Sequence, residues 1–328
     1  MAIIVTGSIA TDHLMTFPGR FADSLVADKL DRVSLSFLVE TLEVRRGGVA
    51  ANISFGLGCL GLRPVLVDAV GIDFDDYRSW LERHGVDTES VHVSEVHHTA
   101  RFVCTTDVEA NQLASFYPGA MSEARDIELL PVVERVGHPD LVIIGPTDPD
   151  GMLRHTEECR QRGYPFAADP SQQLARMDGP DIRQLVDGAT YLFTNEYEAA
   201  LTEQKTGWSA EEILDRVGCR ITTLGDKGAR VERRGQPIVE VGCPQEDAVL
   251  DPTGVGDAFR AGFVAGLAWG VSDERCAQVG SMLATQVIET VGTQEYSLGR
   301  QRFLDRIAST YGDGAAAEIG EHVRCPLP

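Results

Sequence analysis

Late in its sequence the chain reads Asp251-Pro252-Thr253-Gly254-Val255-Gly256-Asp257-Ala258-Phe259. Two glycines leave a turn of bare backbone N–H groups just before an apolar helical pattern over residues 258–263. Amides at a helix N-terminus, with the positive end of the helix dipole, favour an anion such as a phosphoryl group. Asp257 falls in the first helical turn, where a carboxylate accepts a proton from an attacking hydroxyl. The stretch predicts phosphoryl transfer to an alcohol; the alternative is a glycine turn with Asp257 as a helix cap.

Upstream of this stretch, short apolar runs alternate with helical patterns. The predicted buried strands cover residues 3–6, 64–70, 141–145, 166–169, 191–194 and 220–224. The helical patterns cover residues 50–60, 77–84, 152–162 and 210–217. This alternation predicts an α/β fold with a mostly parallel sheet flanked by helices on both faces. Ligands of such sheets bind at the carboxyl ends of the strands.

Three segments interrupt this rhythm. Residues 31–40 and 100–106 alternate apolar and polar side chains, and residues 112–117 look like the partner of the second segment across a turn. We expect them to form a small β-sheet over the strand ends, a lid that excludes water from a transferring group. The predicted core comprises residues 1–11, 47–98 and 121–328, and the predicted lid comprises residues 12–46 and 99–120.

Composition excludes several classes of partner. With 29 Lys and Arg against 50 Asp and Glu, the formal net charge of the 328 residues is −21, which repels nucleic acid and anionic membranes. A local cluster of amides with Mg²⁺ still accommodates an anionic nucleotide. The seven cysteines form no C-x-x-C pair, which argues against a disulfide framework or a zinc site. No signal peptide or bilayer-spanning stretch is evident, so a cytoplasmic protein is expected.

Polar residues near the first strand and the first crossover helix are candidate ligands for a sugar. Ser8 and Asp12 follow the first strand, and the two carboxylate oxygens of Asp12 suit a vicinal diol. Gly48 lets a ligand approach the backbone closely, and Asn52 lies about one helical turn further on. The alternatives are a turn or cap aspartate and a surface asparagine at a helix entry.

Two later segments are candidates for the nucleotide side. Asn195 and Glu198 share one face of a helical turn, which suits Mg²⁺ held through water; the alternative is a helix cap. Residues 222–228 predict a strand and a tight turn bounded by Gly225 and Gly228, suited to nucleotide phosphates or ribose, or simply a hairpin.

The order of these motifs resembles the ribokinase-like carbohydrate kinases, over essentially the whole chain. Residues 251–257 resemble the second signature of that family and residues 47–61 the first, while Asn195 and Glu198 match its N-x-x-E element. Within the family the chain is similar to the bacterial adenosine kinases. The segments that carry this similarity are residues 7–14, 34–38, 100–102, 115–120 and 169–173. The Asn-x-Asp common after the first strand of sugar kinases is missing, which counts against ribokinase or fructokinase activity.

The resemblance implies a role for each matched position. Asp257 would be the base and the amides of Gly254, Val255 and Gly256 the anion hole. The implied contacts with the nucleoside are Ser8, Asp12, Ser36, Gly48, Asn52, Phe102, Phe116, Gln172, Gln173 and Arg176, of which Phe102 and Phe116 would stack on adenine. The implied contacts with ATP are Asn195, Thr223, Gly225, Asp226, Gly228 and Gly256, with Glu198 facing Mg²⁺.

The predicted activity is therefore ATP-dependent phosphorylation of the 5′-hydroxyl of adenosine, giving AMP and ADP in purine salvage. The alternatives are a related kinase for another nucleoside, a sugar or a non-sugar alcohol, and a non-catalytic adenosine sensor. We expect Mg²⁺ as cofactor, and the resemblance leaves open a requirement for K⁺ near Asp251 and residues 287–292. Open lid edges predict a homodimer through the lids.

Overall fold

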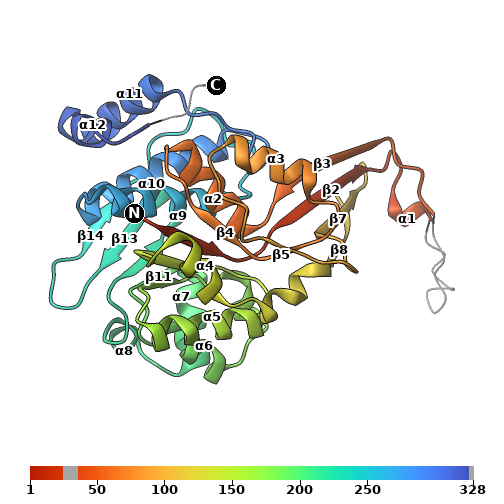
Figure 1. Cartoon of the computed structure of the whole chain (residues 1–328). Helices are drawn as coiled ribbons and strands as arrows, with labels where there is room; N and C mark the ends of the chain where they lie inside the picture. The colour runs from red at the N-terminus through yellow and green to blue at the C-terminus, as the bar shows by residue number, and fades with distance from the viewer. Residues whose placement is uncertain (25–35, 325–328) are drawn as a thin grey trace.

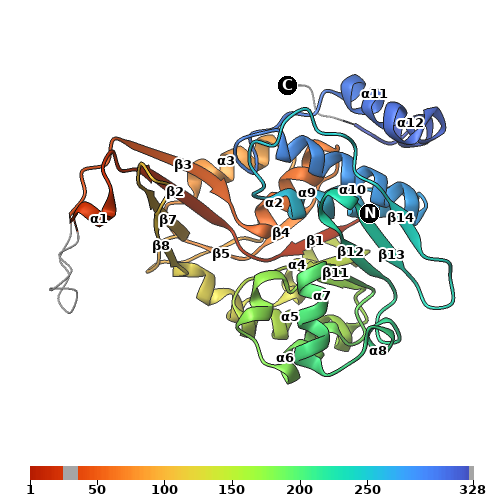
Figure 2. The same cartoon turned by 180° about the vertical axis from the view of Figure 1, so that it is seen from behind.

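Two β-sheets of different size organise the chain, and a short third sheet pairs β5 (Ala69–Val70) with β6 (His92–Val93). The computed structural model describes residues 1–24 and 36–324. Helices cover both faces of the large sheet, while the small sheet projects to one side with α1 (Phe21–Ser24) at its tip (Figures 1 and 2).

The large sheet has the strand order β14-β13-β12-β11-β10-β9-β1-β4. Its strands are β1 (Ile3–Thr6), β4 (Val65–Val67), β9 (Leu141–Ile144), β10 (Phe166–Ala168), β11 (Tyr191–Asn195), β12 (Arg220–Thr223), β13 (Ala229–Glu232) and β14 (Val239–Val241). The pairs from β4 to β12 are parallel, and the pairs β12–β13 and β13–β14 are antiparallel. The predicted mostly parallel sheet is confirmed, and so is the hairpin that starts from the strand over residues 220–223.

Alternation along β1 divides the core into two clusters. Ile3 and Val5 pack on one face and Ile4 on the other, because successive strand residues point to opposite faces. The first face is covered by α2 (Val49–Cys59), α3 (Asp75–Arg83), α9 (Val255–Trp269), α10 (Asp273–Ile288), α11 (Arg300–Tyr311) and α12 (Asp313–Gly320). The second is covered by α4 (Leu129–Val136), α5 (Pro149–Arg162), α6 (Gly179–Val186), α7 (Glu196–Thr206) and α8 (Ala210–Leu214).

The predicted strand over residues 64–70 is two strands, β4 and β5, which join different sheets. Asp68 lies between them and is buried, and its carboxylate accepts hydrogen bonds from the Ala69 N–H at 2.8 Å and from Thr147 Oγ1 at 2.9 Å. The polar residue interrupts an otherwise apolar run at the point where the chain passes from the large sheet to the short third sheet.

The small sheet has the order β3-β2-β7-β8 and comprises β3 (Thr41–Gly47), β2 (Ala10–Thr16), β7 (Ala100–Thr106) and β8 (Gln112–Tyr117). The strands predicted over residues 100–106 and 112–117 are confirmed. The strand predicted over residues 31–40 is wrong for residues 36–40, which form a loop, and its remainder lies outside the described residues. The loop is held by Phe37, which packs against Phe17 and Phe21, while β2 pairs with residues 41–47.

Short 3₁₀ segments complete the connections: Gly119–Asp126 after β8, Ser171–Ala175 after β10, and Gly225–Lys227 after β12. Within residues 1–24 and 36–324, none of the helices combines the length and the apolar character that crossing a membrane requires.

Candidate functional site

A cavity of about 320 Å³ opens where the small sheet meets the N-terminal ends of α2 and α9. It is lined by Ser8, Ala10, Asp12, Gly47, Gly48, Val49, Asn52, Phe116, Met121, Pro146, Gln172, Gln173, Arg176, Thr253, Gly254, Asp257 and Thr293. Ten of the predicted site residues are in this lining. Ser36, Phe102, Val255, Gly256 and the residues predicted for the ATP side are not.

Asp257 lies in the first turn of α9, as predicted, and shares the cavity with Asn52. The Asn52 Nδ2 donates a hydrogen bond of 2.8 Å to Asp257 Oδ2. Burial raises the pKa of Asp257 to about 6, although the charge of Arg260 and the hydrogen bond from Asn52 act in the opposite direction. A carboxylate with such a pKa is ionised at neutral pH and is basic enough to accept a proton.

The orientation of Asn52 is fixed by residues from distant parts of the chain. Its Oδ1 lies 2.9 Å from both Thr293 Oγ1 and Gln294 Nε2. Gln294 Nε2 also donates to the Tyr77 hydroxyl at 2.5 Å, which in turn donates to the Gly47 carbonyl at 2.8 Å. With its oxygen so engaged, Asn52 presents its NH₂ group to Asp257.

Sequence reasoning did not identify Tyr77, Thr293 or Gln294 as part of the site. The available signal was the adjacent polar pair Thr293-Gln294, two residues that are nearly fully buried after the end of α10. Buried polar side chains require partners, so such a pair indicates an internal network.

The turn before α9 is shaped by glycine. Gly254 caps the helix with a φ of 77°, in the left-handed region, and a Cβ there would lie 2.8 Å from Thr293 Cγ2. No side chain caps this helix end among the described residues, so its first-turn amides are left without a side-chain acceptor. This is the arrangement expected of an anion hole made by Gly254, Val255 and Gly256.

Gly48 brings α2 close to the chain that follows β1. Its φ is 95°, and a Cβ would lie 2.5 Å from the Ser8 carbonyl oxygen. The Val49 N–H donates to Ser8 Oγ at 3.1 Å, so the Ser8 side chain caps the same helix entry. Both residues line the cavity, and any side chain at position 48 would displace the backbone there.

Asp12 lies within β2 and not in a turn, with Arg45 opposite in β3 and Phe102 opposite in β7. Burial raises the pKa of Asp12 to about 6; the Arg45 charge opposes this shift and Asp251 adds to it. Gly47 leaves room for the carboxylate, since a Cβ there would lie 3.1 Å from Asp12 Oδ2.

Phe102 and Phe116 are opposite each other in β7 and β8. Directly paired residues point to the same face of a sheet, so Asp12, Phe102 and Phe116 share the face that borders the cavity. Phe116 is 49 % exposed and lines the cavity, while Ser36 is exposed in the loop before β3 and does not reach it.

The segment after β10 contributes three polar side chains to the lining of the cavity. Gln173 is 5 % exposed, and its Nε2 donates to the Thr147 carbonyl at 2.6 Å. Gln172 accepts a hydrogen bond from Ser171 Oγ at 2.7 Å, and Arg176 is exposed at the rim. All three predicted residues therefore lie beside the cavity.

The residues predicted for the nucleotide side gather at the ends of β11 and β12. Asn195 and Glu198 form a reciprocal capping box at the start of α7, with both hydrogen bonds 2.8 Å long. Thr223 pairs with Asn195 across the two strands, and the turn over residues 225–228 follows directly. The sequence alternative, a helix cap, is thus present whatever else these two side chains bind.

A buried ion pair unmarked by sequence reasoning lies beside Glu198. Arg260 Nη2 donates to Asp169 Oδ1 at 2.6 Å, and Arg260 Nε lies 2.5 Å from Asp169 Oδ2. The Glu198 carboxylate is 3.9 Å from the same guanidinium. The signal in the sequence was an arginine three residues after Asp257, inside an apolar helix.

Comparison with known proteins gives a consistent result. Residues 9–298 match the pfkB family carbohydrate kinases. The ligand-free nucleoside kinase of Burkholderia thailandensis is 36 % identical, with a TM-score of 0.85 over 93 % of this chain and 99 % of that one. The same enzyme in complex with inosine is 35 % identical, with a TM-score of 0.82 over 95 % of this chain and 99 % of that one.

A curated archaeal relative agrees. The nucleoside kinase of Methanocaldococcus jannaschii is 27 % identical over 272 residues, which cover 81 % of this chain and 87 % of that protein.

Proposed function

The chain belongs to the pfkB family of carbohydrate kinases, and from this premise we propose that it transfers the γ-phosphoryl group of ATP to the 5′-hydroxyl of adenosine. The observation that carries the proposal is Asp257, a carboxylate with a raised pKa that Asn52 holds beside the free amides of α9. The products would be AMP and ADP, and we assign the reaction to purine salvage in the cytoplasm.

Each part of the cavity has its own role in the proposed reaction. Asp257 takes the proton from the 5′-hydroxyl as that oxygen attacks, and the amides of Gly254, Val255 and Gly256 stabilise the charge on the transferring group. Asp12 and Asn52 hold the ribose diol, with Gly48 allowing the sugar to approach the backbone. Positioning accounts for much of the rate, because the chain supplies a fixed geometry for an in-line displacement.

Aromatic side chains support a purine acceptor. Phe116 borders the cavity from the small sheet, and Phe102 lies beside it on the same face. Stacking between aromatic rings favours a nucleobase and adds little for a free sugar. Ser8, Gln172, Gln173 and Arg176 surround the same space from the core and supply polar contacts to the base or sugar.

A second candidate acceptor is inosine. The Burkholderia thailandensis enzyme, 35 % identical, has a structure in complex with inosine. The cavity here holds the same kinds of group that either purine requires, an aromatic face with amides at its edge, and comparing kcat/KM for adenosine and inosine distinguishes the two.

The residues present fit ATP and Mg²⁺. The glycine turn of α9 leaves amides without a side-chain acceptor, and Thr223, Gly225, Asp226 and Gly228 lie at the ends of neighbouring strands for the rest of the nucleotide. Within the described residues no three Asp, Glu, His or Cys side chains form a metal cage. Mg²⁺ keeps several waters and binds substrate phosphates, so a single carboxylate at Glu198 suits it. When bound, the ion neutralises phosphate charge.

The residues near Asp251 fit K⁺ less well than the residues above fit ATP and Mg²⁺. Asp251 Oδ1 accepts the Thr253 N–H at 2.9 Å, Oδ2 accepts the Gly292 N–H at 3.0 Å, and the Arg45 guanidinium lies 3.6 Å away. The carboxylate is thus supplied with donors and a cation from the protein, and no step is assigned to K⁺.

The small sheet supports two structural proposals. The predicted lid comprises residues 12–46 and 99–120, of which residues 25–35 lie outside the described residues. Its described strands act as a cover that brings Phe102 and Ser36 to the base when it closes. The sheet face opposite Asp12 carries the exposed side chains Leu42, Val44, Leu113 and Tyr117. We assign this apolar face to a homodimer contact, and a monomeric mass at micromolar concentration would rule it out.

The test is release of ADP from ATP and Mg²⁺ with adenosine, inosine, guanosine, ribose or fructose as acceptor. Highest kcat/KM with adenosine supports the proposal, and highest kcat/KM with inosine supports the second candidate. Turnover of a free sugar alone would contradict the role of the aromatic side chains. Tight adenosine binding without turnover would indicate a sensor instead of an enzyme.

A further inference from the structure

Arg260 and Asp169 form an ion pair below the first turn of α9. Arg260 is 7 % exposed and Asp169 is fully buried. Asp169 engages the Nε and Nη2 atoms of the guanidinium, and Glu198 lies beyond hydrogen-bond distance of Nη2, at 3.9 Å. Among the residues that the structure describes, no carboxylate forms an ion pair with the third nitrogen, Nη1.

The Nη1 atom lies against Gly256, one of the anion-hole residues. A Cβ built on Gly256 would be 2.8 Å from it, closer than real side chains approach. Side chains on a helix lean toward its N-terminus, so an arginine one turn after Gly256 extends back to the turn that holds the amides. Glycine at position 256 leaves the guanidinium this place, and any side chain there would push the Nη1 atom away from the turn.

The location is unfavourable for stability in two respects. The N-terminal end of a helix dipole is positive, so it favours anions and opposes a cation such as Arg260. A buried ion pair also loses the hydration of both ions, and well-packed apolar residues often replace one at no cost in stability. Violations of such local rules cluster at functional sites.

The guanidinium nonetheless keeps its charge. Burial alone would lower the pKa of Arg260, but the charges of Asp169, Asp257 and Glu198 raise it above its ordinary value. The buried positive charge thus lies against Gly256 and acts electrostatically on Asp257.

We propose that Arg260 is a positioning residue that gives the anion hole a fixed positive charge through Gly256, with Asp169 holding the guanidinium in place. The proposal rests on the phosphoryl transfer proposed above. The negative charge that develops on the transferring phosphoryl group is then stabilised by amides and by a guanidinium that needs no rearrangement during the reaction.

The experiment replaces both partners, Arg260→Gln with Asp169→Asn, so that no unpaired charge is left buried. We expect kcat to fall about 10- to 100-fold, because removing a fixed charge that stabilises the transition state typically costs that much. The KM for the nucleoside should stay within threefold. The affinity for the β,γ-imido analogue of ATP should fall more than the affinity for ADP, since only the analogue places a third phosphate at the anion hole.

The matched control is Arg233→Gln with Asp273→Asn. That pair makes the same two-pronged contact, at 2.6 and 2.9 Å, away from the cavity. We expect it to leave kcat and both nucleotide affinities unchanged. If the Arg260 and Asp169 double variant does not fold, Arg260→Lys keeps the charge and should keep the ratio of the two nucleotide affinities within twofold of the wild type.

The outcomes separate this inference from the proposed function. A folded double variant with kcat within threefold of the wild type overturns the role of Arg260 and leaves the kinase activity standing. An equal loss in the Arg233 control, or a collapsed affinity ratio in Arg260→Lys, overturns it too. If the wild type turns over no acceptor, the proposed function fails, and the two nucleotide affinities decide whether Arg260 supplies anion-binding charge.

Discussion

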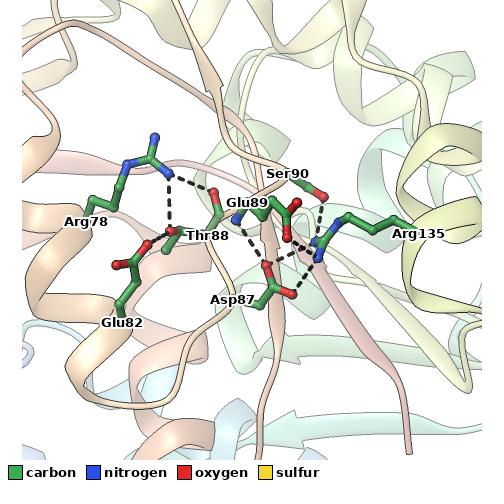
Figure 3. A network of polar contacts seen from close by, with 7 residues as sticks. All are labelled: Arg78, Glu82, Asp87, Thr88, Glu89, Ser90 and Arg135. Carbon is green, nitrogen blue, oxygen red and sulfur yellow. Dashed lines mark hydrogen bonds and ion pairs between the residues drawn. The ribbon is translucent and has the colours of Figure 1, made fainter.

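Two polar clusters of this molecule are each built around an aspartate whose pKa is shifted, but in opposite directions. In the cavity, Asp257 receives one side-chain hydrogen bond, from Asn52. At the surface, Asp87 receives both terminal nitrogens of Arg135, at 2.8 and 3.0 Å, and the Glu89 N–H at 3.0 Å (Figure 3). Arg135 belongs to α4, so this surface cluster ties the segment after α3 to a helix of the opposite face.

The pKa values of the two aspartates move in opposite directions. Burial raises the pKa of Asp257 to about 6, because the charge of Arg260 and the one hydrogen bond from Asn52 do not offset the lost hydration. Burial acts in the same sense on Asp87, but the hydrogen bonds and charge of Arg135 together hold the pKa of Asp87 below its ordinary value. Asp87, which ties two segments together, is fully paired, whereas Asp257, the proposed base, is left partly unpaired.

The largest effect is expected from Asp257→Asn. The variant keeps the shape of the side chain and removes the base, so kcat should fall about 10²- to 10⁴-fold. Asp87→Asn is the control and should leave kcat unchanged. Steady-state kinetics of both variants test the difference, and near-normal turnover by Asp257→Asn would refute its role as base.

The next largest effect is expected on KM for the nucleoside, from the two phenylalanines proposed to stack on the base. Phe116→Ala and Phe102→Ala should each raise KM for the purine nucleoside about 10-fold, because each removes stacking and apolar contact. The KM for ATP should stay constant. Arg135→Gln, in the surface cluster, should change neither KM; an unchanged nucleoside KM in both phenylalanine variants would contradict stacking.

The pH dependence of activity tests the two cavity aspartates, Asp257 and Asp12. Burial raises the pKa values of Asp257 and Asp12 to about 6, and both groups must be ionised for their proposed roles, Asp257 as base and Asp12 as ligand of the ribose diol. Thus kcat/KM should fall as the pH drops below about 6, more steeply than for one proton. A profile flat down to pH 4.5, measured with a nucleoside that does not titrate there, would exclude both groups.

The pH dependence of stability should have opposite signs in the two clusters. The raised pKa of Asp257 gives stability that is complete below the unfolded-state value and lost as the pH rises through about 6. Asp257→Asn should therefore gain Tm over the wild type between pH 4 and pH 7. The lowered pKa of Asp87 gives stability above the unfolded-state value that is lost on acidification, so Asp87→Asn should lose Tm most at neutral pH. Calorimetry across this range checks both signs.

The smallest effect is expected on the free energy of unfolding, from Arg135→Gln in the surface cluster. This side chain is partly exposed, so the loss should be about 1 kcal/mol of unfolding free energy at low salt. Added NaCl screens such pairs, and the loss should shrink at 1 M NaCl. Urea titration measures it, and a loss that is independent of salt would show packing and not charge to be responsible.

The sequence by itself determined the elements whose signals are local. Alternation and short apolar runs identified the parallel strands and the pair β7 and β8, because side-chain period reports secondary structure directly. The turn over residues 251–257 identified the start of α9 and placed Asp257 in its first turn, since glycine and helix periodicity act over a few residues.

Tertiary structure alone decided how the site is held. Asn52 meets Asp257 across 205 residues of sequence and Gln294 across 242, and no local pattern encodes such distances. The same is true of β2, where pairing with β3 and β7 placed Asp12 in a strand, and of Arg260, whose partner Asp169 comes from another strand end. Burial and long-range pairing set the charge state of these groups, and both exist only once the chain has folded.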